Sequence, residues 1–229
     1  MKTIGLIGGM SWESSIEYYR FVNESVKEKL GGLHSAKCVM YSVDFAEIEI
    51  LQHQGRWQEA SQVLVAAAQS VERAGADFVL LCTNTMHKLA EDIQAKINIP
   101  FLHIADATAQ AIRAAGIDQV GLLGTRFTME EDFYKGRLQQ QHGLTVLIPD
   151  DQEREIIDRV IYQELVLGVI RPESKAQYVQ VIGRLVQSGA QGIILGCTEI
   201  GLLVHQKDSP VPVFDTARIH AEAAVEYAL

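Results

Sequence analysis

Short apolar segments alternate with helical patterns along the whole chain. Runs of four to eight residues rich in Val, Ile and Leu, such as 3–8, 78–82 and 192–196, are each followed by a longer segment with helical spacing. Near-continuous apolar runs of this length are typical of strands that helices cover on both faces. Strand–helix alternation produces right-handed βαβ units and parallel sheets. The sequence therefore predicts an α/β fold with parallel sheets flanked by helices.

Three segments of the first half recur in the second half in the same order. The pairs are 3–19 with 119–135, 73–85 with 187–199, and the short segments around Pro100 and Pro212, at offsets of 116, 114 and 112. Within the first pair, Gly5 falls on Gly121, Gly8 on Gly124, and Tyr18 on Tyr134. Matches near half the chain length indicate an internal duplication.

The duplication predicts two similar α/β lobes related by pseudo-twofold symmetry. We expect residues 1–100 and 206–229 to form the first lobe and residues 101–205 to form the second, with the active site in the cleft between them. Ligands of open parallel sheets bind beyond the carboxyl ends of the strands, where helix N-termini present free N–H groups. In this arrangement Thr83 and Cys197 come to opposite walls of the cleft. Two groups placed in this way suit the transfer of a proton from one face of a carbon to the other.

Composition and charge limit the class of protein. The 229 residues are 48% hydrophobic and 21% charged, which is typical of a globular protein with one large or two small domains. No apolar run approaches the roughly 20 residues of a membrane helix, and the N-terminus does not resemble a signal peptide. The net charge of −9 is not offset by a basic cluster. We therefore expect neither a membrane nor a nucleic acid as partner.

The three cysteines differ in the roles that their positions predict. An odd number of cysteines in or beside apolar runs argues against a disulfide framework and favours the reducing cytoplasm. Cys197 stands at a strand-to-helix turn, where N–H groups and the helix dipole are expected to lower the thiol pKa below about 8.5. A buried structural cysteine is the other interpretation. Cys82 and Cys38 are expected to be structural, since Cys82 points away from its neighbour Thr83.

Motifs of several other site classes are absent. The first glycine-rich turn, with glycines at 5, 8 and 9, lacks the G-x-G-x-x-G spacing, and there is no phosphate-binding G-x-x-x-x-G-K-[ST] loop. No G-x-S-x-G turn suggests a catalytic serine. No pair of His, Cys or carboxylate side chains has metal-ligand spacing on one element. His87, at the start of a predicted helix, has two interpretations, as a residue close to the site or as a helix cap.

Three short motifs resemble those of the aspartate/glutamate racemase family. The family carries IGGM near the N-terminus, CNTxH after one strand and GCTE after a later strand, and here the matching positions are Ile7–Met10, Thr83–His87 and Gly196–Glu199. The resemblance spans essentially the whole chain. It implies a two-lobed α/β homodimer that racemises a small acidic amino acid without pyridoxal phosphate, metal or nucleotide, that is, without any cofactor.

The same resemblance leaves alternatives open. The family includes relatives that decarboxylate malonates or isomerise maleate, so a cofactor-free decarboxylase or cis–trans isomerase of small dicarboxylates remains possible. A non-catalytic amino-acid-binding protein is a further alternative. Aspartate and glutamate differ by one methylene, which changes discrimination by only about 1–3 kcal/mol. The sequence does not choose between these two substrates.

The resemblance also assigns catalytic roles. In the family, one cysteine thiolate removes the α-proton and the opposite thiol returns a proton to the other face. Cys197 matches the second of these cysteines, whereas Thr83 stands where the family has the first. A threonine hydroxyl is too weak an acid to hold a useful fraction of alkoxide at neutral pH. We therefore expect Cys197 to act as the base, Thr83 or a water that it holds to act as the opposite-face acid, and the L-enantiomer to be favoured.

Substrate-binding candidates follow from the same motifs. They are Met10, Gln52, Asn84, Thr85, Thr125, Glu164, Thr198 and Glu199. Asn84, Thr85 and Thr198 would bind the α-carboxylate. Residues 44–57, interpreted as a loop, would cover the side-chain carboxylate and supply Gln52 and also Arg56. Further candidates on the second copy of the first loop are Arg126 and Thr128.

Overall fold

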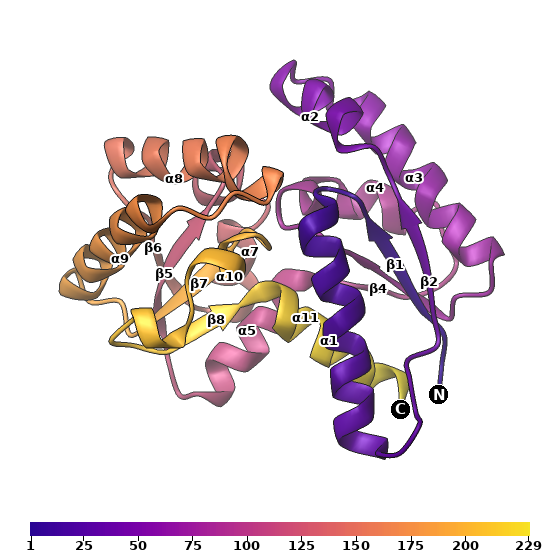
Figure 1. The fold of residues 1–229 in the computed structure, drawn as a ribbon. Helices are drawn as coiled ribbons and strands as arrows, with labels where there is room; N and C mark the ends of the chain where they lie inside the picture. Colours follow the sequence, from indigo (N-terminus) through magenta and orange to yellow (C-terminus); the bar gives the residue numbers. More distant parts are fainter. The chain divides into compact units, whose positions relative to one another are not determined.

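Two four-stranded parallel sheets form the framework of the computed structural model, which describes residues 1–229 (Figure 1). The first sheet has the order β2-β1-β3-β4 and the second the order β6-β5-β7-β8. The strands are β1 (Ile4–Gly8), β2 (Cys38–Ser42), β3 (Phe78–Leu81), β4 (Phe101–Leu102), β5 (Gln119–Gly124), β6 (Thr145–Leu147), β7 (Gly192–Gly196) and β8 (Val213–Asp215). Every pairing within the sheets is parallel. The predicted α/β class with two similar lobes is confirmed.

Helices connect the strands and lie against both faces of each sheet (Figure 1). They are α1 (Trp12–Leu30), α2 (Phe45–His53), α3 (Trp57–Arg73), η1 (Thr85–Leu89), α4 (Ala90–Gln94), α5 (Ile104–Ala114), α6 (Arg126–Glu130), α7 (Lys135–His142), α8 (Asp151–Gln163), η2 (Leu165–Leu167), α9 (Pro172–Gln187), α10 (Ile200–Leu203), η3 (Gln206–Asp208) and α11 (Thr216–Ala228). None of these helices combines the length and the apolar character needed to cross a membrane.

The duplicated glycines lie at equivalent places in the two sheets. A Cβ atom at Gly5 of β1 would stand 2.4 Å from Val71 Cγ1 of α3. A Cβ atom at Gly121 of β5 would stand 2.9 Å from Leu185 Cδ1 of α9. Each glycine therefore lets the long crossover helix approach the middle strand closely. The equal strand orders and these equivalent contacts agree with the predicted duplication.

The boundaries of the two units differ from those expected. The first unit consists of Met1–Ile104 and His220–Leu229, and the second of Ala105–Ile219. Strand β4 pairs with β3, which extends the first unit beyond residue 100. Strand β8 pairs with β7, so the segment from residue 206 to 219 belongs to the second unit and not to the first. Hydrogen bonding of these short edge strands thus sets both boundaries.

Residues 44–57 are largely helical, contrary to the expected loop. Helix α2 occupies Phe45–His53, and the Asp44 carboxylate accepts a hydrogen bond of 3.0 Å from the Ala46 amide. An aspartate in this place satisfies one of the free N–H groups of the first helical turn. Helix α8 begins in a similar way, because Asp150 and Glu153 form a capping box. The N-cap residue was a sequence signal for α2.

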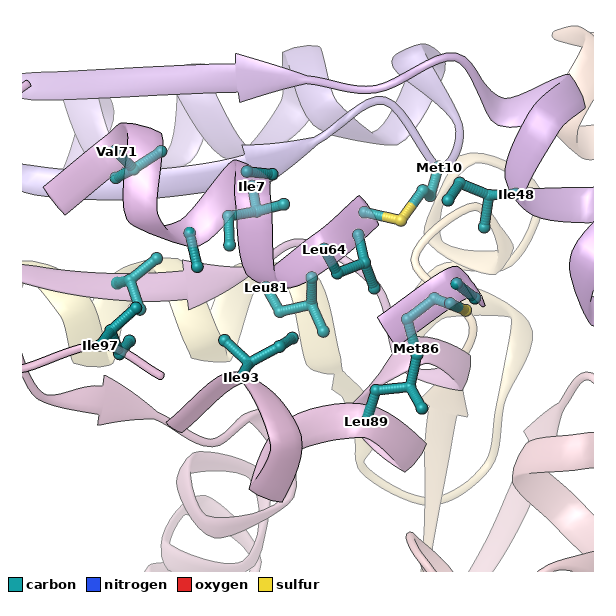
Figure 2. Packing of buried hydrophobic residues seen from close by; sticks show 14 of the residues in the cluster. Ile7, Met10, Ile48, Leu64, Val71, Leu81, Met86, Leu89, Ile93 and Ile97 are labelled. Atoms are coloured by element: carbon teal, nitrogen blue, oxygen red, sulfur yellow. The ribbon is translucent and has the colours of Figure 1, made fainter. Parts of the chain in front are cut away.

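One buried apolar cluster of the first unit lies between its sheet and helices α3 and α4. Ile7 of β1 and Leu81 of β3 face Leu64 and Val71 of α3 and Ile93 of α4, and all five side chains are buried (Figure 2). The central strands β1 and β3 are buried along their whole length. Burial of a side chain of this size contributes about 1.5–3 kcal/mol. This packing holds the carboxyl ends of β1 and β3 in a fixed place.

Candidate active site

The loop after β1 is held by a chain of short hydrogen bonds. The Gly9 amide donates to Ser15 Oγ at 2.8 Å, and the Ser15 hydroxyl donates to the Ser11 carbonyl at 2.7 Å. Gly9 has a φ of 96°, and a Cβ atom there would lie 2.2 Å from the Val43 carbonyl oxygen. Only glycine fits this turn. The loop thereby carries Met10 into the buried apolar cluster of the first unit.

The loop after β3 separates the two neighbours Cys82 and Thr83. The Cys82 amide donates to the Ile7 carbonyl at 2.9 Å, and the Thr83 amide donates to the Leu81 carbonyl at 2.9 Å. The Cys82 side chain is completely buried, and burial raises the pKa of its thiol. A thiol held protonated in this way is a poor nucleophile and a poor base. The structural role expected for Cys82 agrees with its surroundings, and Thr83 is the residue left at the end of the strand.

His87 of η1 is bound to the backbone through both ring nitrogens. Its Nδ1 lies 2.6 Å from the Thr83 carbonyl oxygen, and its Nε2 lies 3.2 Å from the Ile104 amide nitrogen. Because an amide can only donate, Nε2 must accept, and the ring proton is on Nδ1. The imidazole is therefore neutral and donates to the Thr83 carbonyl. His87 thus holds the backbone of the Thr83 loop, a role that neither interpretation from the sequence had stated.

A second buried histidine supports the same region. The ring of His220 in α11 lies 6.0 Å from that of His87. Its Nε2 is 3.0 Å from the Leu102 carbonyl oxygen, and its Nδ1 is 3.0 Å from the Tyr18 hydroxyl. The carbonyl accepts, so Nε2 carries a proton and donates to Leu102, while the Tyr18 hydroxyl is the hydrogen-bond partner of Nδ1. Two buried imidazoles thus connect α1, β4, η1 and α11.

Met10 and Gln52 lie at the same end of the first unit as the β3 loop. Met10, Ile48 of α2 and Met86 of η1 belong to one buried cluster (Figure 2). The Gln52 amide nitrogen lies 2.7 Å from Met86 Sδ, and its side chain is buried. Asn84 and Thr85 are buried next to Met86. The structure therefore gathers these predicted residues around the carboxyl end of the first sheet.

Arg56 does not belong to this buried group. Its guanidinium makes two contacts of 2.6 Å with the exposed carboxylate of Glu59. The pKa of the Glu59 carboxyl is lowered by this partner. Arg56 is thus engaged at the surface, at the N-terminus of α3.

In the second unit, β7 ends in a thiol that contacts a carboxylate. Cys197 Sγ is 2.9 Å from Glu199 Oε2, and the Thr198 hydroxyl donates to the same oxygen at 2.9 Å. All three side chains are buried. One carboxylate oxygen therefore accepts from two neighbouring side chains. This arrangement fixes the thiol at the carboxyl end of the strand.

The pKa of Cys197 is raised, contrary to the expectation of a helix-stabilised thiolate. Burial is the main cause, and the negative charge of Glu199 raises the pKa further. The helix that follows, α10, is only 4 residues long, so it offers little of the stabilisation expected from a helix N-terminus. Without a ligand, Cys197 is therefore a thiol that donates to Glu199.

Thr125 and Cys197 follow neighbouring strands at the carboxyl end of the second sheet. It follows Gly124 of β5, which pairs with Gly196 of β7. Thr125 is also the N-cap of α6, since its side chain accepts from the Thr128 amide at 3.3 Å. Arg126 pairs at the surface with Asp151 and Glu130, at 2.6 and 3.0 Å. Thr125 is thus close to the thiol, while Arg126 has other partners.

Glu164 directly follows α8 in the second unit. Its carboxylate accepts a hydrogen bond of 2.6 Å from the Ser174 hydroxyl, and both residues line a surface groove of about 420 Å³. Arg159 and Arg171 line the same groove. The negative charge of Glu164 is one of the causes that raise the pKa of the buried Tyr178.

Two neighbours of Cys197 are absent from the sequence-based candidates. The Asp158 carboxylate of α8 adds to the rise in the Cys197 pKa, and Cys197 itself adds to the rise in the pKa of the buried Tyr178 in α9. The Tyr178 hydroxyl donates to the Ile157 carbonyl at 2.9 Å. Neither residue stands in a motif. Only the packing of α8 and α9 brings them near the thiol, so the sequence carried no direct signal.

Comparisons with known proteins give a consistent result. A family model described as Asp/Glu/Hydantoin racemase matches residues 7–224. RacX from Bacillus subtilis, named a broad specificity amino-acid racemase, is 25% identical over 171 residues, or 73% of this chain and 71% of RacX.

Solved structures cover the chain more completely. A protein from Yersinia pestis, provisionally named an Asp/Glu racemase, is 59% identical, with a TM-score of 0.92 over 100% of this chain and 99% of its own. PH1733 from Pyrococcus horikoshii, described as an aspartate racemase homologue, is 38% identical, with a TM-score of 0.86 over 100% and 99% of the two chains.

Proposed function

The chain belongs to the Asp/Glu/Hydantoin racemase family and is an isomerase of amino acids, and from this premise we propose that its substrate is aspartate, glutamate or both. The names of the relatives support an acidic substrate, since one is an aspartate racemase homologue. The free state of Cys38, Cys82 and Cys197 supports our further proposal that the enzyme works in the reducing cytoplasm.

The contact between Cys197 and Glu199 is the observation that carries the proposal. It places a thiol at the carboxyl end of a buried strand, with a carboxylate at 2.9 Å. An incoming α-ammonium group would bring a positive charge to Glu199. This charge would offset the negative one that raises the Cys197 pKa, and it would favour the thiolate when substrate is bound. The Cys197 thiolate would thus form when the substrate is bound.

In the proposed reaction, the Cys197 thiolate removes the α-proton of the L-amino acid. The C–H electron pair remains on the α-carbon, and hydrogen bonds from Asn84, Thr85 and Thr198 hold the adjacent carboxylate. The Thr83 hydroxyl, or a water that it holds, donates a proton to the opposite face. Cys197 then carries a proton and Thr83 or its water lacks one. Exchange with solvent restores both groups.

The unequal acid–base pair gives the proposed enzyme an asymmetry. Racemisation has an equilibrium constant of one, so kcat/KM is equal in the two directions. Hydrogen exchange need not be equal, because a thiolate removes a proton from the L-enantiomer far more readily than a hydroxyl removes one from the D-enantiomer. We therefore propose that L-substrates exchange the α-proton faster than they invert.

This proposal is tested by proton NMR in D₂O. L-aspartate and L-glutamate are expected to lose their α-proton NMR signal faster than the D-enantiomers accumulate. Accumulation of the D-enantiomer is followed by circular dichroism. Cys197→Ala is expected to abolish exchange, since general-base catalysis contributes about 10²–10⁴-fold. Cys38→Ala serves as the matched control, because Cys38 lies on the edge strand β2 and should leave exchange unchanged.

Exchange that persists in a folded Cys197→Ala variant would disprove the assignment of the base. A second panel of aryl malonates and maleate distinguishes the alternatives. Turnover of these compounds without amino-acid exchange would indicate a decarboxylase or a cis–trans isomerase. Binding of L-aspartate without exchange would indicate a protein that has lost its catalytic function.

A further inference from the structure

Asp158 of α8 binds the first backbone amide of α6. The Arg126 N–H group donates to Asp158 Oδ1 at 2.8 Å. Arg126 is the first helical residue after the N-cap Thr125, and an N–H group at this position has no partner within its own helix. A carboxylate 32 residues further along the chain therefore completes the N-terminal cap of α6.

The equivalent loop of the first unit is held from within its own helix. There, the Gly9 amide donates to the hydroxyl of Ser15 in α1, which is 19 residues long. Helix α6 has only 5 residues, and a helix of this length depends on tertiary contacts for its stability. The second copy of the loop thus receives from another helix a contact that the first copy makes by itself.

Helix α6 in turn packs on the end of β7. A Cβ atom at Gly124 of β5 would lie 3.2 Å from Thr128 Cβ, and one at Gly196 of β7 would lie 3.4 Å from Thr128 Cγ2. Thr128 of α6 therefore covers the last residues of two neighbouring strands. Gly196 directly precedes Cys197. A displacement of α6 would change the packing of the strand end that carries the thiol.

The charge of Asp158 also acts on Cys197. Burial is the main cause of the raised Cys197 pKa, Glu199 is the next, and the negative charge of Asp158 adds to both. Tyr178 of α9 faces the same group, and its own pKa is raised by burial, with Cys197 and Asp158 as further causes. The groups that surround the thiol thus come from its own loop, from α8 and from α9.

We propose that Asp158 is a positioning residue for the reaction: by accepting from the Arg126 amide it holds α6 and the Thr125 turn against the end of β7, a role that rests on the proposed assignment of Cys197 as the base. Asp158 has two effects on the thiol, one through α6 and one through its charge. An amide oxygen can replace the carboxylate in the hydrogen bond but carries no charge, so the two effects can be separated.

Two substitutions of Asp158 separate these effects. Asp158→Asn keeps an acceptor for the Arg126 amide, so the ¹³Cβ NMR titration of Cys197 should move to lower pH while the plateau rate of L-aspartate exchange stays close to that of the wild type. Asp158→Ala should move the titration in the same direction and also lower the plateau rate by up to about 10²-fold, the effect of a misplaced catalytic group. Asp151→Asn is the matched control, since this exposed carboxylate of α8 pairs only with guanidinium groups at the surface.

A second pair of variants tests the hydrogen bond without changing the carboxylate. Arg126→Pro removes the N–H group at the first helical position, where proline is favoured, and Thr125 has a ψ of 159°, which suits a residue before proline. Arg126→Ala keeps the N–H group and removes only the guanidinium. The plateau rate of Arg126→Pro is expected to fall below that of Arg126→Ala. Circular dichroism establishes folding, and this pair provides the answer should Asp158→Ala fail to fold.

Hydrogen exchange of the Arg126 amide measures the same contact without substrate. The amide should be protected in the wild type and in Asp158→Asn, and lose its protection in Asp158→Ala. Equal plateau rates within each pair of variants, or equal protection in Asp158→Asn and Asp158→Ala, would overturn the positioning role. An unmoved titration in Asp158→Asn would overturn the effect of the charge. Failure of the proposed function gives a different result: L-aspartate exchange would persist in Cys197→Ala, while the amide protection and the Cys197 titration would still respond to Asp158.

Discussion

The loops after β3 and β7 follow equivalent strands of two sheets with the same strand order, but their polar groups have different partners. In the first loop, Thr83 is held through its backbone, which donates to Leu81 and accepts from His87. In the second loop, Cys197 is held through its side chain, which donates to Glu199. The two copies of one fold element thus present an oxygen on a fixed backbone and a sulfur in a charged contact.

This difference shows that the two equivalent loops are chemically unequal. A hydroxyl held only through its backbone can deliver a proton, but it does not become a strong base. A thiol next to a carboxylate has a raised pKa, yet it responds strongly to any charge that reaches the carboxylate. The variants below make the two loops more alike, or separate their contributions.

Thr83→Cys removes the chemical difference and is expected to have the largest effect. A thiol at this position can act as a base as well as an acid, so inversion should become about 10²-fold faster in both directions. Circular dichroism with both enantiomers measures the rates. Thr83→Ser, which keeps the hydroxyl, is the control and should resemble the wild type. If a folded Thr83→Cys variant inverts neither enantiomer faster, Thr83 is not the opposite-face group.

Glu199→Gln tests the charge at the second loop. The proposed reaction requires the Cys197 thiolate, so kcat/KM should rise with pH through the raised pKa of Cys197. Glutamine removes the negative charge of Glu199 that raises the Cys197 pKa, and the ascending limb of the profile should move to lower pH. The measurement is the exchange rate of L-aspartate against pH. An unmoved limb would show that the Glu199 charge does not contribute to the Cys197 pKa.

The sequence predicted the parts of the fold and site that depend on local pattern. Apolar runs and turn glycines gave the strands, and the repeated segments gave the two equivalent sheets. The raised pKa of Cys197 could not be predicted from the sequence, because it depends first on burial of the thiol and then on the contacts with Glu199 and the charge of Asp158 from a distant helix. Strand β8 was assigned to the wrong lobe, since its pairing with β7 is a tertiary contact.

His87 illustrates the same limit at the first loop. Its place after Thr85 did not reveal that both ring nitrogens bind backbone groups, because one partner, Ile104, lies 17 residues further along the chain. Motif position indicates that a residue is near a site. The direction of its hydrogen bonds indicates what it does there.

His87→Phe is expected to have a smaller effect, on the first loop alone. Phenylalanine leaves the Thr83 carbonyl and the Ile104 amide without their imidazole partner, which costs about 1–3 kcal/mol of stability. Inversion should slow more than exchange from L-substrates, because Thr83 and not Cys197 is displaced. His87→Asn can still donate to Thr83 and should restore part of the inversion rate. His53→Asn, at an exposed position of α2, is the control. Equal losses in exchange and inversion would contradict a role specific to Thr83.

Gly5→Ala and Gly121→Ala compare the frameworks beneath the two loops, and their effect on activity should be the smallest. At Gly5 the new methyl group would lie 2.8 Å from the Phe78 carbonyl oxygen, a backbone atom that cannot move away easily. At Gly121 the nearest atoms are the ends of two flexible side chains, Ile193 Cδ1 at 2.8 Å and Leu185 Cδ1 at 2.9 Å. Overpacking costs about 1–3 kcal/mol, and Gly5→Ala should lie at the upper end of this range and Gly121→Ala at the lower. Denaturant unfolding of the two variants measures the difference. Equal losses in the free energy of unfolding would mean that the first sheet adjusts to a methyl group as easily as the second. The closer approach of α3 to β1 would then make the first loop no more rigid than the second.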